Sequence, residues 1–361
     1  MYVFWLILMV CVLALVQVAY YNRHGLDRVE YERRFSKKRV FAGDSLEMVE
    51  VLANDKLTPL PWVRIESRIS QNLRFGKQDN LDINMDRFHK SMFFMGPYKR
   101  ITRRHQVTAV RRGYYDCRSV SLSVGDLLGL ATKSCDLQCD ARLMVYPRLT
   151  LPEDMPVQAL EWQGDVSVRR WIDPDPVLVN GIREYVHGDP RKDVHWPATA
   201  RTGQLMVKIR DYTVTPRLLV LLNSQISEFL WGAMEPRDTV KLEHGVSLAA
   251  ALVNWGVSHG MNVGFRSNGG NALSSRAGEY ISVDPAAGNL DRVLEALAVL
   301  VIKRQVDFAK LMDDEIDRRT SGMDILCISA YWSEALEERA SQLRRMGNSV
   351  TFMPVQKGGR T

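Results

Sequence analysis

The chain begins with one long apolar run, after which its hydrophobic pattern changes twice. Residues 2–21 are almost continuously apolar. At about 1.5 Å per helical residue, such a run crosses the roughly 30 Å hydrocarbon layer of a bilayer. No basic region precedes the run and no small-residue cleavage site follows it, which favours an uncleaved transmembrane helix over a signal peptide. We therefore predict a membrane-spanning helix over residues 1–22.

Basic residues crowd the C-terminal side of this run, and they predict its orientation. They are Arg23, Arg28, Arg33, Arg34, Lys37, Lys38 and Arg39. The positive-inside tendency keeps such a flank in the cytoplasm. We expect a single-pass protein of the inner (cytoplasmic) membrane with its body in the cytoplasm. The same bases would lie well against anionic headgroups, so membrane lipid is an expected partner.

After the run, short stretches of β-forming residues alternate with polar positions and are separated by turn residues. These stretches cover residues 45–54, 62–69, 91–95, 106–110 and 120–124. Alternation with a period of two is typical of half-buried strands. It predicts an antiparallel β-sandwich domain over residues 35–150. Pro152, Pro156, Pro174 and Pro176 then favour an extended linker over residues 150–180, within a linker and signature segment at 151–215.

From residue 216 onwards the rhythm changes to strands that alternate with helices. Apolar stretches at 217–223, 261–267, 323–329 and 349–355 predict strands, and 277–283 resembles one arm of a hairpin. Helical patterns cover 240–258, 290–300 and 333–346. Such alternation requires a mostly parallel sheet covered on both faces. We predict a doubly wound α/β domain over residues 216–361, and hence an α+β multidomain protein.

Composition narrows the classes of function. The 361 residues are 46% apolar, enough for a membrane span and two modest domains. A net charge of +6, from 48 bases against 42 acids, is explained by the local basic cluster, so no nucleic acid partner is expected. The five cysteines are odd in number and scattered, which favours a reducing compartment. Cys135 and Cys139 lack the spacing and the second pair of a zinc site.

The most informative stretch runs from residue 183 to residue 211, where glycines, charges of both signs and aromatic residues are crowded together. The residues that carry this pattern are Arg183, Glu184, Tyr185, Gly188, Asp189, Arg191, His195, Trp196, Ala200, Arg201, Gly203 and Lys208. Together they resemble the signature of the domain-of-unknown-function-58 family. Thr199 stands where a serine is more usual in that family.

The resemblance extends more loosely over most of the chain. The family's D-L-L-G-L stretch corresponds to residues 126–130, for which turn and packing roles are expected. The C-terminal half is similar to von Willebrand factor A domains. Those domains bind a divalent cation through D-x-S-x-S after the first strand, because a hard cation needs oxygen ligands that include negative ones.

In this chain the corresponding loop has lost its negative charge. Asn223 replaces the aspartate, Gln225 replaces the first serine, and Ser227 alone is retained. The strand that would supply a second carboxylate ends at Ser329 and Ala330. Asn223, Gln225, Ser227 and Ala330 thus form a degenerate metal loop, and we expect neither a metal nor a cofactor. Asn223 and Ser227 are expected to cap the following helix or to contact a partner.

The signature also allows two catalytic interpretations, a metal cluster and a general base. His187, Asp189, Asp193 and His195 have the residue types of a metal cluster, but Arg191 and Lys192 among them would repel a cation. His195 could be a general base, but no nucleophile motif or phosphate loop accompanies it. A salt-bridged hub is favoured, with Trp196 as its apolar anchorage. The hub would consist of Arg183, Asp189, Arg191, His195 and Arg201.

These observations predict a membrane-anchored, non-enzymatic adaptor that mediates protein–protein interactions. The family resemblance implies a MoxR-type AAA+ ATPase as partner, transglutaminase-like membrane proteins as associated partners, and a role in complex assembly or envelope maturation. Two alternatives stay open. One is a hydrolase that uses the His195 region, and the other is a structural membrane protein that self-associates through a sandwich edge.

Overall fold

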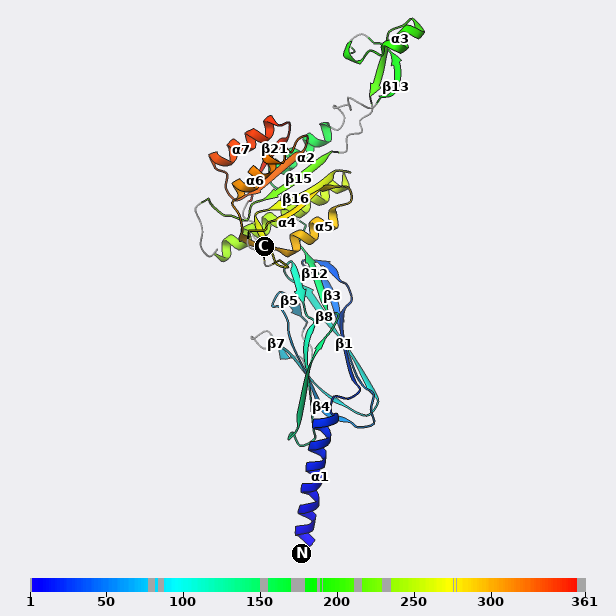
Figure 1. Ribbon diagram of the computed structural model, residues 1–361, viewed down its shortest axis with the longest axis vertical. Coiled ribbons are helices and arrows are strands. Elements are labelled where there is room, and N and C mark those ends of the chain that lie inside the picture. The colour runs from blue at the N-terminus through cyan, green and yellow to red at the C-terminus, as the bar shows by residue number, and fades with distance from the viewer. Residues whose placement is uncertain are drawn as a thin grey trace. The chain divides into compact units, whose positions relative to one another are not determined.

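The computed structural model describes residues 2–76, 82–83, 88–149, 155–169, 179–186, 189, 191–210, 216–228, 235–274, 276 and 278–355. The chain divides into two compact units. The first contains Met1–Arg148 and Leu297–Val299, and the second contains Leu149–Ala296 and Leu300–Thr361. An apolar N-terminal helix, several antiparallel sheets and further helices make this an α+β multidomain protein, as expected (Figure 1).

Helix α1 covers Tyr2–His24 and contains the apolar run. It is long and apolar enough to cross a membrane, and none of the residues in its most apolar window is buried. Only its last turns touch the rest of the first unit, where Tyr21 is 8% exposed and Val18 packs against the same cluster. The length and composition therefore agree with the predicted membrane span.

The rest of the first unit is built from antiparallel sheets. One sheet has the strand order β1-β3-β8-β5, a second has β11-β10-β4-β7-β6, and β2-β12-β9 form a third in which β2 and β12 are parallel. The bounds are β1 Val29–Phe35, β2 Arg39–Phe41, β3 Ser45–Asn54, β4 Leu60–Arg68, β5 Leu73–Phe75, β6 Asp82–Ile83, β7 Phe88–Met95, β8 Lys99–Ala109, β9 Gly113–Asp116, β10 Ser119–Gly125, β11 Thr132–Gln138 and β12 Arg142–Tyr146.

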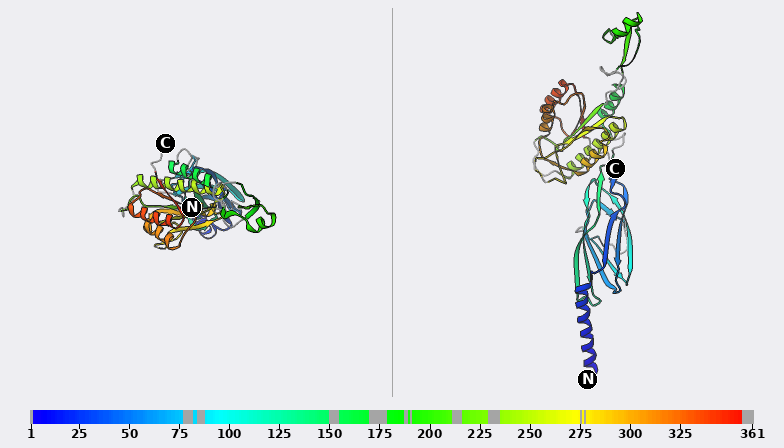
Figure 2. Two further views of the ribbon diagram at one scale, coloured as in Figure 1. Left: turned by 90° about the horizontal axis from the view of Figure 1, so that it is seen from above. Right: turned by 45° about the vertical axis from the view of Figure 1, so that its right-hand side comes forward.

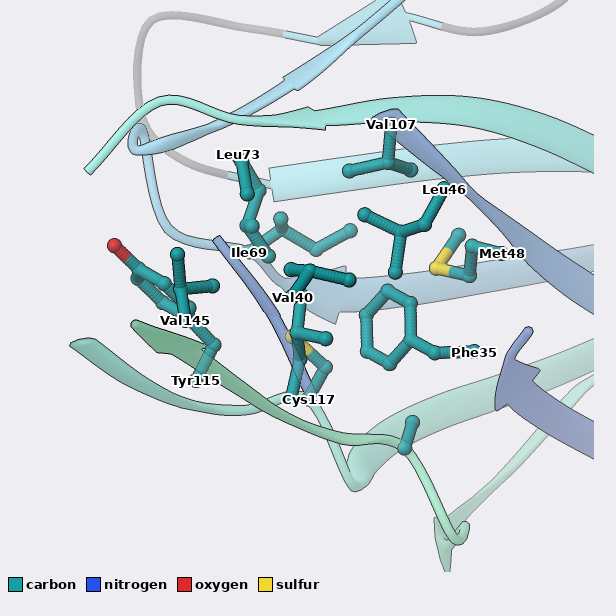
Figure 3. Packing of buried hydrophobic residues seen from close by; sticks show 13 residues of the cluster. Phe35, Val40, Leu46, Met48, Ile69, Leu73, Val107, Tyr115, Cys117 and Val145 are labelled. Carbon is teal, nitrogen blue, oxygen red and sulfur yellow. The ribbon is translucent and has the colours of Figure 1, made fainter. Parts of the chain in front are cut away.

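Two apolar clusters hold these sheets together. One joins side chains of β1, β3, β5, β8, β9 and β12, and Figure 3 shows Phe35, Met48 and Val107 meeting in it. The other joins Leu52 of β3 to Ile65 of β4 and Leu122 of β10. Alternate residues of β3 are buried along most of its length, as the period-two pattern predicted. The strands β1, β2, β5, β6, β9, β11 and β12 were not predicted, because they are short or rich in polar residues.

Arg33 does not belong with the bases expected at the lipid headgroups. Its guanidinium lies 2.6 Å from Glu50 Oε1, and its side chain is 0% exposed. Glu50 Oε2 lies 2.9 Å from His105 Nε2, and Tyr31 donates a hydrogen bond to Oε1. The alternation of β1 turns Arg33 inward, so burial and pairing decide its place and the expectation for this residue was wrong.

The second unit contains a largely parallel sheet of order β18-β16-β15-β20-β21, in which the edge strand β18 is antiparallel. Leu219 and Leu221 pack against α6 and α7 on one face, while Leu218 and Leu222 meet α4 on the other. Figure 2 shows α6 and α7 in orange and red. The bounds are β15 Arg217–Leu222, α4 Pro236–Ser258, β16 Asn262–Ser267, β17 Gly269–Asn271, β18 Ile281–Ala286, α5 Leu290–Val299, β19 Leu300–Arg304, α6 Phe308–Asp317, β20 Asp324–Ser329, α7 Glu334–Arg345 and β21 Ser349–Pro354.

Part of the expected extended linker is helical. Residues Val157–Arg169 form α2, whose first turn is closed by hydrogen bonds from the Ala159 and Leu160 amides to the Pro156 carbonyl. Trp162 is 3% exposed, and its ring lies 5.0 Å from that of Trp255 in α4. A proline just before a helix is compatible with its start, so the prolines do not exclude α2. Pro152, Pro174 and Pro176 lie outside the described residues.

Candidate functional site

The first candidate site lies where the strand order of the parallel sheet reverses. From β15 the chain continues to β16 on one side, and it later returns to β20 on the other side. Ligands of open α/β sheets bind at such a switch point, beyond the carboxyl ends of the strands. Asn223 follows β15, Asn268 follows β16 and Ser329 ends β20. These positions bring together residues that are more than 40 positions apart in the sequence.

Hydrogen bonds join these residues into what we call the strand-tip network. Asn223 Nδ2 donates to Ser329 Oγ at 2.9 Å, and Asn268 Nδ2 donates to Asn223 Oδ1 at 3.1 Å and to Gln225 Oε1 at 2.9 Å. The Ser224 amide donates to Asn268 Oδ1 at 2.7 Å. The network consists of Asn223, Ser224, Gln225, Ser267, Asn268 and Ser329.

The network is buried and its polar groups are used internally. Its members are at most 4% exposed. Gln225 Oε1 also accepts the amide of Phe308, the first residue of α6, at 2.9 Å. The network consists of neutral amides and hydroxyls that bond to one another, whereas a hard cation prefers carboxylates. Within the described residues, no group of three or more His, Cys, Asp or Glu side chains could hold a metal ion. The arrangement ties three strand tips to the start of α6.

The expected helix cap at Asn223 was wrong. Helix α4 begins at Pro236 with Glu235 as its N-cap residue, and the Asn223 side chain points into the strand-tip network instead. Ser227 and Ala330 are partly exposed, and neither joins the network among the contacts of the described residues. Sequence reasoning missed Asn268 and Ser267. The signal for Asn268 was its place directly after the strand 262–267.

The second candidate site is formed by residues 179–210, which we call the signature module. Strands β13, Val179–Glu184, and β14, Met206–Arg210, form an antiparallel hairpin. Between them lie a 3-10 turn, Arg191–Asp193, and helix α3, Trp196–Thr202 (Figure 1). Val194 bridges to Val207, and the His195 amide donates to the Met206 carbonyl at 2.8 Å. The sequence resemblance therefore covers a small structural unit.

One charge pair of the expected hub is present. The Arg183 guanidinium donates to both Asp189 oxygens at 2.7 Å, and the Val186 amide donates to Asp189 Oδ2 at 2.9 Å. The hydrogen bond from Arg183 lowers the pKa of Asp189. Bidentate pairs of this kind fix geometry as well as charge. In the described part of the chain, neither Arg191 nor Arg201 joins this pair, so the five-residue hub is not formed as expected.

His195 caps helix α3. Its Nδ1 accepts the Ala198 amide at 3.0 Å, so the proton of a neutral ring is on Nε2. Thr199 Oγ1 accepts the Met206 amide at 3.0 Å and holds α3 against β14. Gly203 ends the helix with a φ of 72°, a left-handed conformation in which glycine is unstrained. Three signature residues therefore have roles in shaping this turn–helix element.

The module has a very small core and an exposed apolar surface. Val194 and Val207 are its buried apolar residues among those described. Trp196 is 68% exposed, so the anchorage expected of it was wrong, because a two-turn helix on a hairpin has too little area to cover an indole. Other apolar side chains are exposed as well, namely Ile182, Val186 and Leu205.

The remaining signature residues add charge to this surface. Glu184, Arg191 and Arg201 are exposed, and Tyr185 is partly exposed. The Tyr185 amide donates to the Leu205 carbonyl at 2.8 Å. Gly188, like His187, lies outside the described residues.

Comparison with known proteins gives a weak sequence relationship. No protein-family model matches this chain. The chain is 23% identical over 249 residues to an uncharacterized protein, YeaD, of Bacillus subtilis. The alignment covers 68% of this chain and 57% of that protein, so the chain spans little more than half of the relative's length.

Solved structures give equally weak similarities. A non-cellulosomal cohesin from Archaeoglobus fulgidus is 5% identical and covers 32% of this chain and 91% of its own, with a TM-score of 0.23. The collagen-binding subdomain ACE19 of an Enterococcus faecalis surface protein is 9% identical and covers 32% of this chain and 95% of its own, with a TM-score of 0.22. These scores are too low to support an argument about fold or function.

Proposed function

We propose that this protein is a membrane-anchored, non-enzymatic adaptor whose signature module docks onto a protein partner. Helix α1 anchors the chain in the cytoplasmic membrane as a single pass, and the body lies in the cytoplasm. The second unit serves as a von Willebrand factor A-like module with a degenerate cation site. The observation that carries the proposal is the exposed apolar surface of a module in which Val194 and Val207 are the buried apolar residues among the described side chains.

The stability of the signature module supports a docking role. An isolated two-stranded hairpin is marginally stable in water, and small units with few buried side chains need a staple or a partner. Trp196 stands out, because exposed tryptophans are enriched among residues that dominate binding energy. A partner that covered Trp196, Ile182 and Leu205 would supply the burial that the module lacks.

Charge indicates the chemistry of the partner surface. Among the described residues of the module, bases outnumber acids, and Asp189 is already paired with Arg183. Besides Arg183, the exposed bases are Arg191, Lys192 and Arg201. They favour an acidic rim around an apolar pocket on the partner. Guided by the family resemblance, we assign the partner to the MoxR-type AAA+ ATPases.

The test measures binding of a MoxR-type ATPase from the same organism to the full chain in lipid nanodiscs. Trp196→Ala is expected to weaken binding by about 2 kcal/mol or more, roughly thirtyfold, because it removes a central apolar contact. Arg191→Ala and Arg201→Ala are expected to slow association and to reduce its salt dependence. The matched control is Leu273→Ala, which removes an apolar side chain that is 59% exposed outside the module.

Two outcomes contradict the proposal. Wild-type affinity of the Trp196→Ala variant would exclude the module as the docking surface. An equal loss in the Leu273→Ala control would show that the binding is a general response to apolar truncation. Circular dichroism of each variant confirms that the chain remains folded.

A further inference from the structure

The loop that follows β10 lies beside the membrane helix rather than away from it. Gln17 Nε2 of α1 donates to Asp126 Oδ2 at 3.4 Å, although the two residues are 109 positions apart. Asp126 is 0% exposed, and its Oδ1 accepts the Ala131 amide at 2.8 Å. Gly129 makes the turn with a φ of 72°. The loop Asp126–Ala131 is thus closed on itself and attached to α1.

The first unit holds the end of α1 at several further points. The Tyr21 hydroxyl donates to the Pro59 carbonyl at 2.8 Å. Lys56 Nζ donates to the carbonyls of His24 and Gly25, and Lys133 Nζ donates to that of Arg23. Lysines at a helix C-terminus satisfy its free carbonyls and the helix dipole. These contacts come from the loop between β3 and β4 and from strand β11, which directly follows the loop Asp126–Ala131, so they fix that loop at the height of Gln17 along α1.

Gln17 lies well inside the apolar run, and this placement has a geometric consequence. The apolar run continues beyond Gln17 to Tyr21, within the predicted membrane span of residues 1–22. If the run is used in full, up to about Tyr21, the boundary lies beyond Gln17. The loop attached to Gln17 is then inside the layer.

The side chains of the loop fit that environment. Leu127, Leu128 and Leu130 are 72%, 58% and 68% exposed, so they point away from the sandwich core. On the neighbouring loop Leu57 is 72% exposed, next to Lys56 and Thr58, which both contact α1. The one charged side chain of the loop, Asp126, is buried and bonded. An apolar tip with its polar group turned inward is what a hydrocarbon boundary requires.

We propose that the loop Asp126–Leu130 is a second membrane contact, in which Leu127, Leu128 and Leu130 insert into the bilayer beside α1. The occupant of this surface is lipid, because the loop is fixed to the membrane helix at a depth that lipid fills. The inference rests on the proposed role of α1 as a membrane anchor. It goes beyond that role, because it makes the sandwich itself a membrane-associated domain with a fixed orientation to the bilayer.

The test uses the full chain in nanodiscs and a nitroxide label whose exposure to lipid-soluble oxygen and to a water-soluble nickel complex is compared. The label is placed at Leu128→Cys, and separately at Leu130→Cys, in a Cys11→Ser/Cys135→Ser background; the other cysteines are buried. The matched control is Val110→Cys. Val110 is an apolar residue that is 40% exposed, and it directly follows Ala109, the last residue of β8. A label on the native Cys11, in a Cys135→Ser chain, reports on α1.

The expected result is that labels at 128 and 130 collide more with oxygen than with nickel, as the Cys11 label does, while the label at 110 shows the reverse. A lipid signal at Cys11 with a water signal at 128 and 130 overturns the loop contact and leaves the anchor standing. A water signal at Cys11 overturns the anchor and the loop contact together. Labels at 128 and 130 that are shielded from both reagents would show a protein contact, which also overturns the proposal.

Discussion

The strand-tip network and the signature module are both polar-rich segments that the sequence marks as sites, and the structure treats them in opposite ways. The network is closed: its six residues are at most 4% exposed and bond to one another. The module is open: Trp196 is 68% exposed and two valines form the described core. The comparison teaches that dense polar character alone does not distinguish a closed network from an exposed surface. The degree of exposure, together with the apolar area left unburied, does.

The contrast follows from where the two segments lie in the fold. The carboxyl ends of buried parallel strands leave polar backbone groups that must be satisfied, and Asn268 does so for Ser224. In the signature module local groups such as the His195 side chain accept the backbone amides. Satisfied buried polar groups stabilise the network, whereas the described side chains of the module stay largely exposed.

The largest effect is expected from placing a charge in the closed network. Asn223→Asp should destabilise the second unit by about 3–5 kcal/mol at neutral pH, because it buries an uncompensated carboxylate. Burial raises the pKa of such a carboxyl, so the native state of the variant binds more protons than the unfolded state. Its stability should therefore fall as pH rises and recover as pH falls toward 4. Hydrogen-exchange protection of β15 and β20 measures the loss.

The matched control for this charge is Asn271→Asp at the partly exposed end of strand β17. Asn271 Oδ1 accepts the Leu273 amide at 2.9 Å, and a carboxylate can accept the same bond. We expect little change in protection in that variant. Addition of millimolar Mg²⁺ should not restore Asn223→Asp, since the other network members are neutral. If Mg²⁺ fully restored the hydrogen-exchange protection of Asn223→Asp, the strand tips would be a cation site that lacks one ligand in the wild type. The contrast between a closed network and an open module would then not hold.

A smaller effect separates a capping role of His195 from a catalytic one. His195→Ala should destabilise the signature module by about 1 kcal/mol, because the Ala198 amide loses its acceptor. His195→Asn should largely restore the module, since asparagine is a preferred N-cap residue. Hydrogen exchange at Ala198 and Thr199 reports both variants. If His195→Ala leaves the Ala198 and Thr199 amides as protected as in the wild type, the ring is not needed as a cap and the hydrolase alternative gains support.

Particular residues show how much could be predicted from the sequence. The span of α1 and the strand β3 followed from apolar length and period-two alternation, which are local properties. The neutral side chains of Asn223 and Gln225 directly after β15 were also visible. The role of Asn268 was not visible, because its hydrogen bond to Asn223 depends on how β16 pairs with β15. Helix α6 and strand β19 were not predicted. Helix α2 was not predicted because the prolines on either side of it favoured an extended linker.

The smallest effect concerns the Arg183–Asp189 charge pair of the open module. Arg183 lowers the pKa of Asp189 by hydrogen bonding, so the folded value lies below the ordinary value of about 3.9. The stabilisation is complete above that ordinary value and is lost as pH falls through the lowered pKa. The Val186 amide donates to Asp189 Oδ2, so its NMR shift in a valine-labelled chain should follow this titration. Arg183→Gln should move the midpoint upward, and an unchanged midpoint would show that the pair does not hold the module in its described form.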